Sequence, residues 1–124
     1  MNGIVVFLGG GTGAVARYLM GLAISHHAKG SVFPWHTLSI NLLGALLIGA
    51  IMELLALRTS LPESMQLLLV TGFLGGFTTF SAFSLESSLM LERGDYANCA
   101  AYIAVSVIGT IALVFAGAWL VRSI

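Results

Sequence analysis

The sequence from residue 72 to residue 81 is Gly72-Phe73-Leu74-Gly75-Gly76-Phe77-Thr78-Thr79-Phe80-Ser81. It lies in the middle of an apolar stretch that runs from about Ser64 to Leu91, long enough to cross a membrane as a helix. Each glycine, however, costs a helix about 1 kcal/mol relative to alanine. In lipid an unwound backbone persists only where protein or a water-filled cavity covers it. The pattern predicts a membrane helix that is broken near its centre.

Broken membrane helices often hold ions, because their freed carbonyl oxygens can act as ligands. The carbonyls and hydroxyls of residues 72–81 are therefore expected to face something other than lipid. A kink that serves helix packing alone would leave the same sequence pattern, so both interpretations stay open at this point.

Three further apolar stretches accompany the broken one, and charged or turn residues separate all four. The expected helices cover about residues 3–24, 37–57, 64–91 and 96–121. Each has the roughly 20 residues that a spanning helix needs, and no period-2 alternation predicts strands. We expect an all-α integral membrane protein with four transmembrane helices in one domain, residues 1–124.

The composition supports this class and excludes others. Hydrophobic residues make up 58% of the chain and charged residues 8%, against about a quarter charged in soluble domains. With a formal net charge of zero, no basic surface for nucleic acid is expected. A single cysteine, Cys99, excludes an intrachain disulfide. His26, His27 and His36 are interpreted as loop histidines, and no catalytic constellation is present, so we expect no enzyme.

The loop cations do not select an orientation in the membrane. Four crossings place Arg58 and Arg122 on one side, and Lys29 and Arg93 on the other. The positive-inside rule needs an imbalance, and this count supplies none. One fixed orientation and insertion in both orientations, with pairing of inverted copies, both remain open.

Polar and small residues recur every fourth position on the second and fourth expected helices. The two stripes are Thr37, Asn41, Ala45 and Gly49, and Tyr102, Ser106 and Thr110. Residues four apart share one helix face. Such stripes can serve helix–helix contact, and hydroxyls can bond their own helix backbone. Two of them in one small bundle also indicate the wall of a polar path.

Four further residues are candidates for function. Phe80 and Phe83 are three apart after the glycines; such aromatics usually pack, but the positive edge of a ring also favours an anion. Arg17 is the one cation well inside an expected span. It either extends to the interface or has a structural or anion-attracting role. Glu86 lies inside its helix end and could face a vestibule.

Three segments of the chain resemble motifs of the Fluc fluoride channels, also called CrcB. They are residues 9–17, 37–44 and 71–84, in the family's order and in a chain of the right length. The resemblance implies a channel of the bacterial inner membrane, surrounded by lipid, that exports toxic fluoride passively. It also implies an antiparallel, dual-topology homodimer with two pores. A small dual-topology multidrug-type transporter is the alternative, but its proton coupling needs an acid in the first helix, which this chain lacks.

The resemblance implies roles for individual residues as well. The residues that match the fluoride pore are Asn41, Phe80, Phe83, Tyr102, Ser106 and Thr110. The backbone carbonyls of Gly75 and Thr78 match the ligands of a structural sodium ion at the dimer centre. Arg17 matches the family's first-helix arginine, Thr37 belongs to its second-helix motif, and Glu86 matches an acid near the pore mouth.

Overall fold

The computed structural model describes residues 2–57 and 62–124. These residues form α1 (Asn2–His27), α2 (Trp35–Leu57), α3 (Glu63–Gln66), the π-helix η1 (Leu67–Leu74), α4 (Gly75–Phe77), α5 (Phe80–Glu92) and α6 (Tyr96–Arg122). The elements from α3 to α5 follow one another as a single span. Within the described residues, four helical segments are long and apolar enough to cross a membrane, which confirms the predicted all-α membrane architecture.

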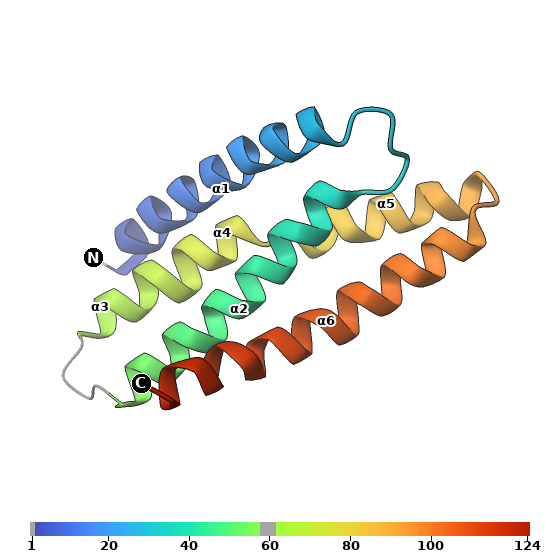
Figure 1. The fold of residues 1–124 in the computed structure, drawn as a ribbon. Helices are drawn as coiled ribbons and strands as arrows, with labels where there is room; N and C mark the ends of the chain where they lie inside the picture. Colours follow the sequence, from blue (N-terminus) through green and yellow to red (C-terminus); the bar gives the residue numbers. More distant parts are fainter. Residues whose placement is uncertain (1, 58–61) are drawn as a thin grey trace.

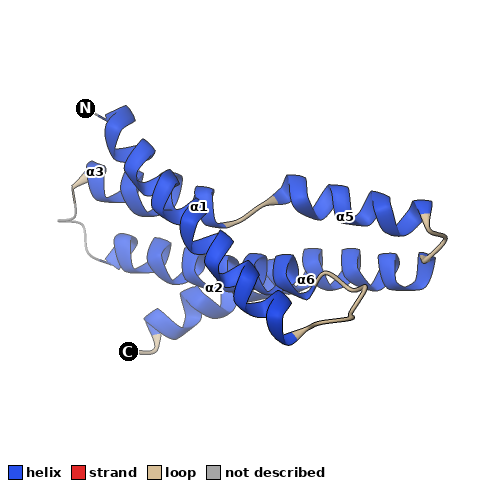
Figure 2. Cartoon of the chain, turned by 90° about the horizontal axis from the view of Figure 1, so that it is seen from above, coloured by secondary structure: helices blue, strands red, loops and turns tan. Residues whose placement is uncertain are grey.

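The spans run back and forth between the two ends of the bundle (Figure 1), and α1 crosses the others obliquely (Figure 2). α2 packs along α6, and α1 packs along η1 and α4. Both chain termini lie at one end of the bundle, as an even number of crossings requires (Figures 1 and 2). The α1–α2 connection and the α5–α6 turn lie at the other end (Figure 1).

Glycines allow α1 to approach the third span closely. A Cβ added to Gly9 would meet the carbonyl oxygen of Leu68, and one added to Gly13 would meet that of Phe73. Small residues let membrane helices contact one another through their backbones. The glycine face of α1 is therefore a packing face.

A small apolar core lies between α2, α5 and α6. It consists of Leu38, Met90, Cys99 and Tyr102, with Phe33, Leu42 and Phe83 packed against it. The Cys99 side chain is only 1% exposed, so it packs as a small apolar group.

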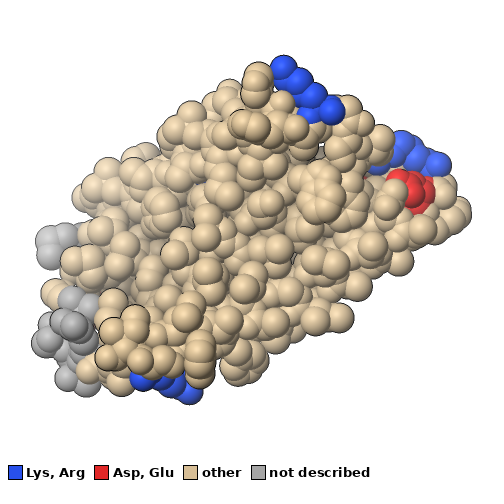
Figure 3. All heavy atoms as spheres, in the orientation of Figure 1, with Lys and Arg blue, Asp and Glu red and all other residues tan. Residues whose placement is uncertain are grey.

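The outer surface of the bundle is apolar. Phe7, Ile108 and Phe115 are 76%, 69% and 72% exposed. On the face drawn in Figure 3, charged side chains lie toward the two ends, and the body between them carries none. A charge in the hydrocarbon is costly, so this distribution fits a surface that faces lipid.

The helices extend further than the sequence predicted around the first connection. α1 continues to His27, whose ring bonds the Ala23 carbonyl at 2.8 Å, and α2 begins directly after Pro34. Proline suits a helix start because its missing N–H would lack a partner there anyway. The interpretation of His26, His27 and His36 as loop residues is therefore wrong, since all three are helical.

The third span is interrupted after its glycines rather than at them. Thr78 and Thr79 have extended backbones, with ψ angles of 160° and 117°, between the end of α4 and the start of α5. Figure 2 shows this extended segment leading into α5. Gly75 and Gly76 stay helical, and a Cβ on Gly76 would meet the Gly10 carbonyl.

Candidate functional site

Asn41 of α2 supports the interrupted backbone. Its Nδ2 donates to the Thr79 carbonyl at 2.9 Å, and the Thr79 N–H donates to Asn41 Oδ1 at 2.8 Å. Inside an apolar bundle, backbone polar groups need protein partners, because no water or lipid group can replace them. Asn41 thus satisfies both backbone groups of Thr79, and its amide nitrogen keeps one more hydrogen for another acceptor.

Among the described residues, the backbone carbonyls of Gly75, Gly76, Phe77 and Thr78 receive no bond from the amide four residues further on. In a continuous α-helix the Thr79 N–H would bond the Gly75 carbonyl, but it bonds Asn41. The Ala82 N–H donates to Thr79 Oγ1 at 3.2 Å instead of to the Thr78 carbonyl. Gly75 and Thr78, the residues predicted as cation ligands, are thus among the residues whose carbonyl oxygens are released from the helix.

Arg17 lies beside one of these carbonyls. Its Nη1 donates to the Thr78 carbonyl oxygen at 3.3 Å, and the bond is partly buried. Arg17 therefore bonds the bundle interior rather than extending to the interface. Because a carbonyl oxygen has two lone pairs, this bond leaves the Thr78 oxygen able to accept a second partner.

A groove of about 350 Å³ follows the interruption along α2, α5 and α6. Its lining includes Asn41, Gly75, Thr78, Thr79, Phe80, Phe83, Ser106 and Thr110. The Phe80 and Phe83 ring centroids are 5.4 Å apart. Both predicted cation ligands and all the predicted pore residues except Tyr102 therefore line one groove.

The α6 hydroxyls in the groove differ in their bonding. Thr110 Oγ1 bonds the carbonyls of Ser106 and Val107 on its own helix, at 2.6 and 3.1 Å. Ser106 Oγ is buried and has no hydrogen-bond partner among the described residues. An unpaired buried hydroxyl costs about 1–3 kcal/mol, so Ser106 is the α6 hydroxyl best placed to bind a ligand or a water.

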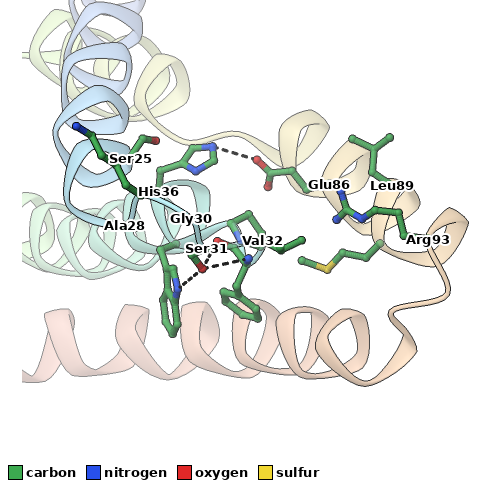
Figure 4. Close-up of a pocket in the computed structure, with 14 residues that line it drawn as sticks. Ser25, Ala28, Gly30, Ser31, Val32, His36, Glu86, Leu89 and Arg93 are labelled. Atoms are coloured by element: carbon green, nitrogen blue, oxygen red, sulfur yellow. Dashed lines mark hydrogen bonds and ion pairs between the residues drawn. The ribbon is translucent and has the colours of Figure 1, made fainter.

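A second polar cluster surrounds the Glu86 carboxylate on α5. Thr37 Oγ1 donates to Glu86 Oε1 at 2.7 Å, and the buried Tyr102 hydroxyl donates to Oε2 at 2.6 Å. His36 Nε2 lies 3.2 Å from Oε1, and Figure 4 shows these two side chains pointing toward each other. Tyr102 and Thr37 thus hold Glu86, which explains why Tyr102 does not line the groove.

A cavity of about 560 Å³ connects the Glu86 cluster with the interruption. Its polar lining includes Arg17, His36, Thr37, Thr79, Ser81 and Glu86. Thr79 lines both this cavity and the groove. The extended segment at Thr79 is therefore the wall that the two spaces share.

The sequence analysis missed the roles of two residues. Thr79 caps α5 and separates the two spaces. Its hydroxyl accepts from the Ala82 amide, and threonine is a preferred N-cap residue, so the sequence could have indicated a helix start here. His36 contacts Glu86 from the first turn of α2. No local sequence signal indicates that contact, because the two residues meet only through the tertiary fold.

The described residues contain no group of three or more His, Cys, Asp or Glu side chains that could hold a metal ion. Glu53, a further acid inside a span, bonds Arg122 at 2.7 Å.

The fold and the site together define a class of protein: a multi-pass membrane protein with an interrupted span beside a polar groove. The chain belongs to the family described as CrcB-like protein, Camphor Resistance (CrcB), whose sequence model matches residues 4–118. The resemblance drawn from the three motifs is thereby confirmed.

Full-length relatives carry a functional name. The fluoride-specific ion channel FluC of Chelativorans sp. (strain BNC1) is 46% identical over 121 residues, covering 98% of this chain and 96% of the relative. FluC of Agrobacterium fabrum (strain C58 / ATCC 33970) is 47% identical over 124 residues, covering 100% and 98%. FluC 1 of Nitrobacter hamburgensis is 44% identical over 119 residues, covering 96% and 94%.

Proposed function

We propose that this protein is a fluoride channel that lets fluoride leave the cell passively across the inner membrane. The observation that carries this proposal is the groove beside the interruption. An amide, a buried hydroxyl with no partner among the described residues and two phenyl rings line this one space. The names of the full-length relatives support fluoride as the transported ion.

The lining suits an anion that must shed its water. Fluoride is small and strongly hydrated, so a pore must offer donors in place of the water it loses. The remaining Asn41 hydrogen, the Ser106 hydroxyl and the positive ring edges of Phe80 and Phe83 are neutral donors. Neutral donors hold an ion strongly enough for entry and weakly enough for release.

The groove needs a cover, and a second copy of the chain is the proposed one. Phe80 is 78% exposed although it lies next to the polar backbone of the interruption. Lipid cannot satisfy such a backbone, whereas an inverted copy would bring the same elements against it. The balanced loop cations permit both orientations. We therefore infer an antiparallel homodimer, with lipid around its remaining surface.

A structural sodium ion fits the released carbonyls. Gly75 and Thr78 each offer a neutral backbone oxygen that has lost its helical donor, and unwound carbonyls are known sodium ligands in transport proteins. Each copy of the chain would contribute this pair of oxygens. When bound, the cation would supply positive charge between the carbonyl oxygens of the two copies and so hold their interrupted spans together.

The test of the function is fluoride release from liposomes that contain the purified protein and potassium fluoride. A passive channel moves charge, so release should be fast only after valinomycin lets potassium follow. A fluoride electrode should record this release, and a chloride electrode should record little in a matched potassium chloride experiment. Release no faster than from protein-free liposomes, or equal release of chloride, would overturn the proposal. The multidrug-type alternative predicts no valinomycin-dependent fluoride release.

A further inference from the structure

His36 stands where two polar spaces meet. It lines the cavity of about 560 Å³ next to Thr79 and also an outer hollow of about 340 Å³ near the α1–α2 connection. Its side chain is 41% exposed, whereas that of Glu86 is 19% exposed. Water and protons therefore reach His36 more readily than the carboxylate behind it (Figure 4).

The described residues around His36 include more cations than acids. The ionisable groups that line the two spaces with it are Arg17 and Tyr18 from α1, Lys29 from the connection, and Glu86 and Arg93 from α5 and its end. Tyr102 of α6 reaches His36 only through Glu86. Among the described lining residues, Glu86 is thus the one acid, and it is the group that an entering anion would meet with repulsion.

We propose that protonation of His36 accelerates anion entry into this protein by offsetting the charge of the Glu86 carboxylate. This inference rests on the proposed fluoride channel. His36 Nε2 lies 3.2 Å from Glu86 Oε1, so protonation of the imidazole places a positive charge directly beside the carboxylate. Protonation therefore changes the electrostatic field in the cavity.

The Glu86 cavity is an open cleft that both His36 and Glu86 line. A charge in a cleft with low-dielectric walls focuses the field and raises the local concentration of the opposite ion. Imidazole is the side chain whose charge normally changes between about pH 5 and pH 8. Fluoride flux should therefore rise at least about threefold between about pH 8 and about pH 5.5.

The experiment measures valinomycin-dependent fluoride release at these two pH values, with the rate of protein-free liposomes subtracted at each pH. The wild type should show the threefold or larger rise. His36→Gln keeps a donor near Glu86 but cannot titrate, so its two rates should be equal. His27→Gln is the matched control, because His27 bonds the Ala23 carbonyl and lines neither space; it should keep the wild-type rise.

A second variant protects the test against a folding defect. His36→Lys carries a fixed charge, so its two rates should also be equal, and size-exclusion elution shows which variants are intact. A flat wild-type profile, or a wild-type rise that persists in an intact His36 variant, would overturn the inference while fluoride release itself continued. Absence of release from the wild type at both pH values would instead overturn the proposed function, and this inference with it.

Discussion

Asn41 meets the backbone of Thr79 with both ends of its carboxamide, at 2.9 and 2.8 Å. That arrangement needs one donor and one acceptor on the same side chain, and the carboxamide of asparagine supplies both. The same side chain lines the groove. A single residue thus stabilises the interrupted backbone and presents a donor to the proposed ion path.

Asn41→Asp should therefore impair both stability and flux. The carboxylate loses the donor to the Thr79 carbonyl and faces that oxygen with another acceptor, at a cost of about 1–3 kcal/mol. It also places an acceptor, charged when ionised, in the way of an anion. Thermal unfolding in detergent and fluoride release from liposomes measure the two effects. Asn98→Asp, on an exposed turn of α6, should change the melting temperature and the fluoride release far less. An Asn41→Asp protein with wild-type stability and wild-type release would contradict this role.

At the scale of elements, the sequence predicted the spans well and the interruption only roughly. Apolar length and charged ends depend on local composition, so the four spans were predictable to within a few residues. The glycines predicted a break within residues 72–81, but Gly75 and Gly76 stay helical, and Gly76 packs against Gly10 of α1. The break occurs where Asn41 takes the Thr79 N–H from 38 residues away. Such long-range competition for a hydrogen bond leaves no local sequence pattern.

In the candidate site, too, the sequence predicted what depends on helical spacing and not what depends on contacts between helices. The stripes and the phenylalanine pair identified most groove residues, since helical spacing alone puts them on common faces. The sequence did not predict that Tyr102 bonds Glu86 rather than lining the groove, or that His36 joins that cluster. Both contacts cross between helices and depend on how closely α2, α5 and α6 approach one another.

The packing of α1 on the third span gives an element-scale prediction. Gly13→Ala would press a methyl group against the Phe73 carbonyl, and overpacking of this kind costs about 1–3 kcal/mol. Gly11→Ala, two residues earlier, meets nothing within 4 Å and should be neutral or stabilising by up to about 1 kcal/mol. Thermal unfolding of the two variants in detergent should separate them clearly. Equal melting temperatures would mean that α1 does not contact the third span at Gly13.

The uncovered groove and the balanced loop cations both bear on how two copies of the chain pair in the membrane. The sequence predicts Arg58 and Arg122 on one side of the membrane and Lys29 and Arg93 on the other. Arg58 lies outside the described residues. A chain without an orientation preference can supply its own inverted partner. An antiparallel dimer would cover the groove of each chain with the same surface of the other.

Biasing the charge should therefore abolish flux from a variant expressed alone. Ser123→Lys with Ile124→Lys adds two cations at exposed positions beside the C-terminus, and Val32→Lys with Glu92→Lys biases the opposite end. Each double variant should insert in one orientation and release no fluoride alone, whereas co-expression should restore release. Ser123→Gln with Ile124→Gln is the neutral control. Wild-type release from either lysine variant alone would contradict dual topology.

Phe80 lines the groove through which fluoride is proposed to cross. Phe80 and Phe7 are almost equally exposed in one chain, at 78% and 76%, but Phe7 lies on α1 and lines neither the groove nor the cavity. Phe80→Ile keeps an apolar side chain but removes the ring edge, and a barrier raised by about 3 kcal/mol slows flux more than a hundredfold. We predict that Phe80→Ile stops fluoride release from liposomes with unchanged size-exclusion elution, while Phe7→Ile conducts like the wild type. Near-normal release from Phe80→Ile would show that fluoride does not pass through this groove.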